Sequence, residues 1–191
     1  PDGGSMVGEG RRQHGSLLLV GDVTGTQTAR VLERVALAKN GGSSFDEAWV
    51  QRLVHRYPQA LPIAEIEPGL SAPVPVCMEL PTPAGFADNL LVTPDGDIVL
   101  VECKLWRNPE ARREVVAQII DYAHCMASWS YEDLERAISR ASVPDGVPRP
   151  RSLFEATHDA EDGGEADFID TVSRNLRLGR MLLLVVGDGI R

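Results

Sequence analysis

The chain has 191 residues, of which 43% are hydrophobic and 25% are charged, which is typical of a folded globular protein with one domain, or one domain with an insertion. Its formal net charge of −9 argues against a surface that coats nucleic acid, although much of the acidic excess lies in residues 159–170. No apolar run approaches the length of about 18 residues that a membrane span needs, and no signal-peptide pattern is present, so we expect no membrane partner and a cytoplasmic location. Cys77, Cys103 and Cys125 lack the spacing of a metal or disulfide framework and are expected to be reduced and mostly buried.

Residues 1–43 are predicted to form an N-terminal extension made of a strand and a helix. Residues 1–5 are expected to be an added leader or a disordered start before Met6. The apolar run at 17–23 predicts a strand, and the helical spacing of apolar residues at 28–39 predicts a helix that ends at the glycines after it.

Residues 44–191 are predicted to form the core. Ser44 and Glu47 have the spacing of a capping box, and apolar residues at helical spacing follow until Pro58 ends the helix. Strands are expected at 74–80, 86–93 and 97–106, then helices at 109–127, 131–141 and 166–176, and a last strand at 181–186 that we expect to be buried on both faces. The Pro- and Gly-rich connection at 143–164 is expected to be poorly ordered, within an insertion at about 129–179. This order predicts an α/β fold with a mixed β-sheet flanked by helices.

Opposite charges interrupt the apolar strand at 97–106. Side chains in a strand alternate between faces, so Glu102 and Lys104 share one face about 6.8 Å apart and Cys103 takes the other, which makes a nucleophilic Cys103 the weaker interpretation. A three-residue turn from Pro94 to Gly96 would place Thr93 opposite Asp97. Counting back along the hairpin, Asp88 then falls opposite Glu102, with Cβ atoms roughly 5 Å apart.

Two adjacent carboxylates repel each other unless they share a proton or a cation. Asp88, Glu102 and the backbone carbonyl of Cys103 are therefore predicted to hold Mg²⁺ or Mn²⁺, with waters completing the shell at about 2.1 Å for Mg²⁺. Lys104 would then act on a water or stabilise a negatively charged phosphate. The alternative is a salt bridge from Lys104 to Glu102 or Asp88 at the end of a sheet.

These residues resemble the PD-(D/E)xK nuclease superfamily, which has the restriction-endonuclease-like fold. The motif is carried by Asp88 in "GFADNLLV" and by Glu102 and Lys104 in "IVLVECKL", although Ala87 stands where the family often has proline. Gln118 and Tyr122 in "AQIIDYA" match the Q-x-x-x-Y motif of the RecB-like branch and lie on one helical face.

The resemblance implies a hydrolase, a Mg²⁺- or Mn²⁺-dependent nuclease, whose catalytic residues would be Asp88, Glu102, Lys104, Gln118 and Tyr122. It implies a nucleic-acid partner, favours DNA over RNA without excluding RNA, and leaves a homodimer open. The family often adds an acid from the first core helix as a further metal ligand, and Glu47 is the candidate, but we expect its capping role instead. The rival interpretation is a non-catalytic nucleic-acid-binding or protein-interaction module with the same fold, which the acidic balance supports and the complete set of Asp88, Glu102 and Lys104 opposes.

Overall fold

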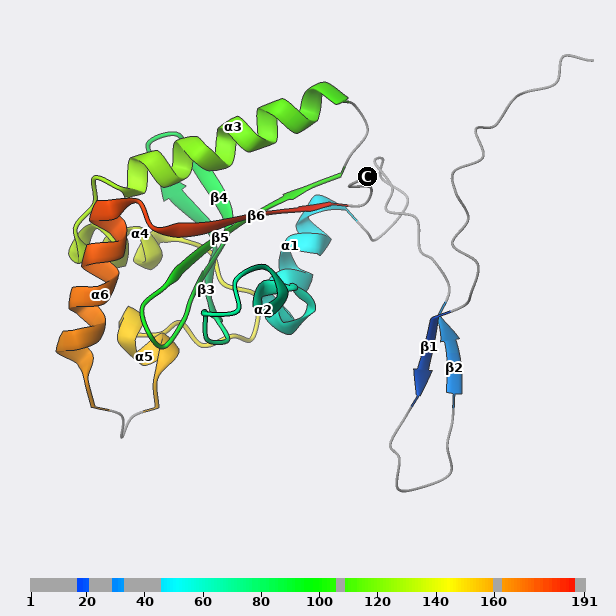
Figure 1. Cartoon of the computed structure of the whole chain (residues 1–191), viewed down its shortest axis with the longest axis horizontal. Helices are drawn as coiled ribbons and strands as arrows, with labels where there is room; N and C mark the ends of the chain where they lie inside the picture. The colour runs from blue at the N-terminus through cyan, green and yellow to red at the C-terminus, as the bar shows by residue number, and fades with distance from the viewer. Residues whose placement is uncertain (1–16, 21–28, 33–45, 106–108, 160–162, 188–191) are drawn as a thin grey trace, which may run out of the picture. The chain divides into compact units, whose positions relative to one another are not determined.

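The structure is a computed structural model that describes residues 17–20, 29–32, 46–105, 109–159 and 163–187 (Figure 1). The chain divides into two compact units, residues 1–36 and residues 37–191. None of the helices that the structure describes is both long enough and apolar enough to cross a membrane.

The first unit contains a two-stranded sheet instead of the expected strand and helix. Strand β1 (Leu17–Val20) pairs antiparallel with β2 (Ala29–Leu32), and Leu17 lies opposite Leu32. The helix expected at 28–39 is therefore wrong over residues 29–32, and the rest of that segment lies outside the described residues. Helix propensity is a weak preference of only a few tenths of a kcal/mol per residue, and pairing with a neighbouring apolar strand outweighs it here.

The second unit contains a four-stranded mixed sheet in the order β3-β4-β5-β6. Its strands are β3 (Val74–Thr82), β4 (Gly85–Val92), β5 (Ile98–Lys104) and β6 (Met181–Gly187). Neighbouring strands are antiparallel except β5 and β6, which are parallel. The predicted α/β architecture with a mixed sheet is thus confirmed.

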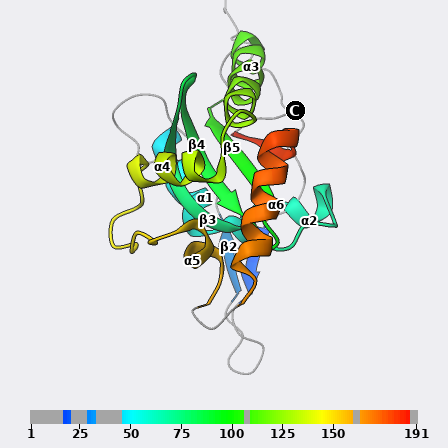
Figure 2. The same cartoon turned by 90° about the vertical axis from the view of Figure 1, so that its left-hand side faces the viewer.

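Helices cover both faces of this sheet, and each face has its own apolar core. Leu100 of β5 packs on one side, in the core that receives α3 (Pro109–Met126), whereas Val101 packs on the other side, against α1 (Glu47–Arg56). The remaining helices on the α3 side are α4 (Tyr131–Arg140), α5 (Leu153–Thr157) and α6 (Glu165–Leu178), which gather at one end of the sheet in Figures 1 and 2. The connection from α1 to β3 holds a short 3-10 turn (Pro58–Ala60) and α2 (Ile63–Ile66).

The described part of the segment at 143–164, residues 143–159 and 163–164, contains a short helix that its composition does not predict. Ser152 caps α5, and Leu153 and Phe154 are buried in the α3-side core. Arg149 donates hydrogen bonds to the carbonyls of Ile138, Ser139 and Ala141 at the end of α4. The buried side chains of Leu153 and Phe154 and the guanidinium of Arg149 therefore hold this Pro- and Gly-rich stretch against the core and the end of α4.

Strand β6 packs against both cores, but its residues are only half-buried. The prediction of full burial on both faces is wrong, because the β6 side chains are only half-buried and no other described strand pairs with the far edge of β6.

The turn between β4 and β5 sets the register of the central hairpin. The Thr93 N–H donates to the Asp97 carbonyl at 2.9 Å and the Gly96 N–H donates to the Thr93 carbonyl at 2.9 Å, as the predicted three-residue turn requires. Gly96 has a φ of +87°, which favours glycine. Asn175 of α6 donates to the Gly96 carbonyl at 3.0 Å, so a helix distant in sequence holds this turn. The predicted hairpin register is confirmed.

Candidate functional site

The sheet splits between its two central strands at the end away from this turn. The β4–β5 ladder ends at the pair Asn89 and Val101. Beyond it, β4 stays paired with β3 as far as Gly85, and β5 stays paired with β6 as far as Lys104 (Figure 1). The edge of β5 beyond Val101 is therefore not paired with β4 in the described ladder, and we call this end of the sheet, where the two strands separate, the β4–β5 opening.

Two carboxylates replace the missing strand along this edge. Asp88 Oδ2 accepts a hydrogen bond from the Cys103 N–H at 2.7 Å, and Glu47 Oε1 of α1 accepts one from the Leu105 N–H at 3.1 Å. The N–H and C=O of one strand residue point to the same edge, so the Cys103 carbonyl also points toward the β4–β5 opening. Two carboxylates and one carbonyl thus converge on this edge.

A change of face in β3 and β4 accompanies the position of Asp88. Cys77 and Leu80 lie three residues apart, as do Leu90 and Ala87, yet all four belong to the α3-side core. In a regular strand such residues would lie on opposite faces. Glu79, next to Leu80, has a φ of +52°, the left-handed conformation that L residues rarely adopt. This irregularity lies beside Asp88 at the place where β4 leaves β5.

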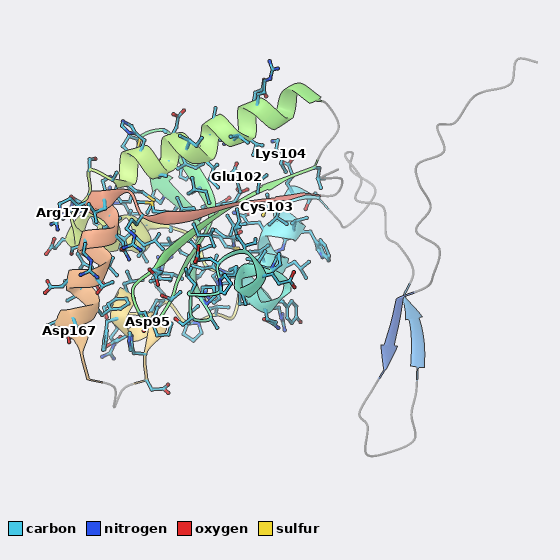
Figure 3. All side chains as sticks on the ribbon, in the orientation of Figure 1. Asp95, Glu102, Cys103, Lys104, Asp167 and Arg177 are labelled. Carbon is cyan, nitrogen blue, oxygen red and sulfur yellow. The ribbon has the colours of Figure 1, made fainter. Side chains whose placement is uncertain are left out.

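Glu102 is buried in β5, on the face that the sequence predicts. Its side chain is 4% exposed, and its Oε2 atom has no hydrogen-bond partner among the described residues. Figure 3 shows Glu102 and Lys104 on the α3 side of β5 and Cys103 on the other side. Asp88 and Glu102 each follow the last β4–β5 pair, Asn89 and Val101, and Asp88 lies close enough to Glu102 to act on its charge, so two acids occupy this end of the sheet.

The electrostatics of the pair reflect this crowding. Burial raises the pKa of Glu102 to about 7, and repulsion from Asp88 adds to this shift. Burial likewise raises the pKa of Asp88 to about 6, against the opposing hydrogen bond from the Cys103 N–H. Lys104 lowers both pKa values and Glu47 raises both, so all four side chains act on one another. The opening holds more negative than positive groups.

Lys104 pairs with an acid that differs from both expected partners. Its Nζ lies 3.5 Å from Glu47 Oε1, and both side chains are partly exposed. The salt bridge to Glu102 or Asp88 is therefore replaced by one to Glu47. This contact places an ammonium group at the solvent side of the opening.

The N-cap of α1 is not the residue that the capping-box pattern indicates. The N-cap of α1 is Asp46, whose side chain accepts a hydrogen bond from the Trp49 N–H at 2.8 Å, and Glu47 is the first helical residue. The capping prediction is wrong because the helix begins two residues later than the pattern suggests, which turns Glu47 toward β5. Ser44 itself lies outside the described residues.

Gln118 and Tyr122 line the opening from α3. Gln118 Nε2 donates to Tyr122 Oη at 2.5 Å. Tyr122 is 2% exposed, and its pKa is raised by burial and by the charges of Glu102 and Asp88, which lie close enough to act on it. A Cβ at Gly85 would lie 3.3 Å from Tyr122 Oη, so the hairpin tip packs on this ring. The structure therefore brings together all five residues predicted as catalytic.

Two supporting residues are absent from the sequence-based site. Gln51 Nε2 of α1 donates to the Asp88 carbonyl at 2.7 Å, and Asn89 Nδ2 donates to the Gln51 carbonyl at 3.1 Å. Both side chains are buried. The sequence does contain a signal for Gln51, because it is a polar residue beside Val50 and Val54 on the apolar face of a helix. A buried side-chain amide in such a position needs a hydrogen-bond partner.

The position of Cys103 disfavours a nucleophilic role. Its side chain is 2% exposed within the α1-side core, and burial raises the pKa of its thiol. Cys77 is also buried and Cys125 is partly buried, and all three are free thiols, as expected.

The carboxylates and the carbonyl at this end of the sheet suit only some kinds of divalent-cation site. Within the described ranges, no group of three or more His, Cys, Asp or Glu side chains is arranged to hold a metal. Mg²⁺, however, is usually held by one or two carboxylates and keeps several waters. Asp88 and Glu102 supply two carboxylates with raised pKa values, and Glu102 Oε2 is buried without a partner in the described structure. These residues fit a hydrated hard cation and do not fit an all-protein cage.

Comparisons of the chain with models of known protein families, with curated proteins and with solved structures find no match.

Proposed function

We propose that this protein is a nuclease that hydrolyses phosphodiester bonds in nucleic acid with Mg²⁺ or Mn²⁺, and that residues 44–191 have a restriction-endonuclease-like fold. The observation that carries the proposal is the β4–β5 opening, where Asp88 and Glu102 have raised pKa values and act electrostatically on each other and on Lys104. The order of α1, the antiparallel strands β3 to β5, α3 and the parallel strand β6 supports the fold assignment.

Asp88, Glu102 and the Cys103 carbonyl would hold the cation. Glu47 lies on the same edge of β5, where its hydrogen bond to the Leu105 N–H orients its carboxylate. A divalent ion in this position would supply Lewis-acid polarisation of the phosphate and would lower the pKa of an attacking water. Without a cation, three carboxylates and one ammonium would repel a phosphodiester.

Lys104 has the geometry to assist at the solvent side of the site. Its partial exposure allows its ammonium to reach a phosphate oxygen, and the ion pair with Glu47 keeps it at the opening. A charge placed where negative charge develops in the transition state stabilises that state more than the ground state.

Tyr122 and Gln118 have a positioning role. The buried Tyr122 ring packs against Gly85, and its hydroxyl accepts from Gln118, whose side chain lies toward solvent on α3. The pair forms a polar edge on the wall of the opening that faces Glu102, suited to hold a nucleic-acid strand at the reacting phosphate.

The test is cleavage of end-labelled single- and double-stranded DNA and RNA with Mg²⁺, with Mn²⁺ and with a chelator. We expect cleavage of DNA that requires the metal and is lost in Asp88→Asn. A matched control is Asp167→Asn, an exposed acid on α6 that lies away from the opening (Figure 3).

If none of these DNA and RNA substrates is cleaved and no divalent metal raises the melting temperature, the protein is the non-catalytic module instead. Equal cleavage by wild type and Asp88→Asn would trace the activity to a contaminating nuclease.

A further inference from the structure

A pocket lies between α1, β3 and the loop at 144–147, and none of the residues that line it belongs to the β4–β5 opening. It has a volume of about 820 Å³ and is lined by α1, by Pro75 of β3 and by the loop at 144–147. This volume falls in the range of about 300–1,000 Å³ that is usual for small-molecule sites.

His55 marks this pocket as more than a surface depression. It lines the pocket, yet its side chain is 4% exposed, and its Nδ1 has no hydrogen-bond partner among the described residues. A buried polar atom without a partner is costly and calls for a ligand or a water. Burial also lowers the pKa of His55, which keeps the imidazole neutral and able to give or accept one hydrogen bond at Nδ1.

The rim of the pocket combines cations with aromatic rings. Arg52 and Arg56 are exposed on successive turns of α1, and neither makes an ion pair within the described part of the chain. The Arg56 guanidinium lies 5.8 Å from the centre of the Tyr57 ring, which is 45% exposed. Trp49 adds a second aromatic side chain, and Asp145 on the loop is the acid of the lining. Cationic side chains surround an aromatic surface in a protein whose net charge is −9.

This combination identifies a chemical class of ligand. Arginine binds phosphate through two parallel hydrogen bonds, aromatic side chains stack on any nucleobase, and a neutral histidine can pair with the polar edge of a base. A simple inorganic anion would use the arginines and leave His55 and the rings without a role. A purely apolar ligand would leave both arginines and His55 without one.

We infer that the pocket between α1, β3 and the loop at 144–147 binds a nucleotide, with its base stacked on Tyr57 near His55 and its phosphate at Arg52 and Arg56. The pocket is distinct from the proposed nuclease site, and the inference stands whether or not that site is active. Helix α1 links the two, because Glu47 and Gln51 at the opening belong to the same helix as the pocket residues. The ligand is either a free mononucleotide or one nucleotide of a nucleic-acid strand that is bound to the protein.

The test is calorimetric titration of the whole chain with adenosine monophosphate, in a chelator so that no metal binds at the opening. Adenosine and inorganic phosphate are titrated separately. We expect adenosine monophosphate to bind more tightly than either part. Tyr57→Ala and Arg52→Ala should each weaken binding by about tenfold, in line with the loss of one stacking or charged contact. His55→Phe, which keeps a buried ring, should weaken adenosine and leave phosphate unchanged.

Two variants serve as controls. Arg177→Ala removes an exposed cation from α6, and Asp88→Asn alters the opening; both should bind adenosine monophosphate as wild type does. Absence of binding at millimolar ligand would overturn the inference, as would binding that Asp88→Asn changes and that Arg52→Ala and Tyr57→Ala leave intact. A short single-stranded oligonucleotide that displaces adenosine monophosphate identifies a strand as the source, whereas failure to compete identifies the free nucleotide.

Discussion

The burial of Glu102 predicts how the stability of the metal-free protein depends on pH. The folded state raises the pKa of this carboxyl from an ordinary value of 4.5 to about 7. Between these values the folded chain keeps a proton that the unfolded chain has lost, so stability falls as the pH rises through this window. A shift of this size corresponds to about 3 kcal/mol of unfolding free energy lost by pH 8. Asp88 contributes in the same direction, with a pKa of about 6.

The perturbation is Glu102→Gln, which keeps the shape of the side chain and removes the charge. Denaturant unfolding in a chelator at about pH 4.5 and about pH 8 should show wild type losing roughly 3 kcal/mol more than the variant over this interval. Glu114→Gln, at an exposed position on α3, should keep the wild-type dependence. Subtracting the pH dependence of Glu102→Gln from that of wild type cancels the contribution of groups that titrate equally in both proteins.

Addition of Mn²⁺ gives an independent check. A cation between the two carboxylates should stabilise wild type by about 2.7 kcal/mol at a hundredfold excess over its dissociation constant, and the effect should be larger at pH 8 than at pH 4.5 because the ion competes with protons. The reasoning is refuted if wild type and Glu102→Gln lose the same stability between the two pH values.

Three further predictions concern the site and the strands that carry it. Lys104→Ala should cut single-turnover cleavage by about a hundredfold or more while Mn²⁺ affinity holds or rises, whereas Asp88→Asn should lose both in parallel; unchanged cleavage by Lys104→Ala would exclude the lysine from the mechanism. Gly96→Ala should destabilise the fold more than Gly146→Ala in thermal unfolding, because both glycines have positive φ but a Cβ at Gly96 would meet side chains of α6 at 3.1–3.2 Å while Gly146 has open space, and equal losses would contradict this. At Glu79, alanine should be less stable than glycine by about 1 kcal/mol, the reverse of the usual order in a strand, and the usual order would argue against the left-handed conformation.

The parts of the site that depend on local rules were predictable from the sequence. Strand alternation places Glu102 and Lys104 on one face, and the turn ending in Gly96 sets the hairpin register up to Asn89 and Val101, the neighbours of Asp88 and Glu102. Helical spacing places Gln118 beside Tyr122. Each of these relations spans a few residues or one tight turn, so backbone geometry alone determines it.

Other features depend on partners that are distant in the chain. Whether Glu47 caps a helix or accepts from the Leu105 N–H is decided by where β5 ends relative to α1. The hydrogen bond from Gln51 to the Asp88 carbonyl also joins residues that are distant in sequence, so local patterns do not predict it. Residues 29–32 have a helical pattern but pair with β1, because a neighbouring strand outweighs a weak local propensity.

The sequence by itself determined which side chains could meet at the end of the central hairpin and that the sheet would be mixed. Only the tertiary structure decided that β4 and β5 separate there, so that Asp88 binds the backbone of β5 and Glu102 stays buried with one oxygen that has no partner among the described residues. The physical reason is that the separation of two strands depends on what each pairs with on its other side. Here β3 holds β4 and β6 holds β5, and β6 joins β5 from the far end of the chain, more than 70 residues away in sequence.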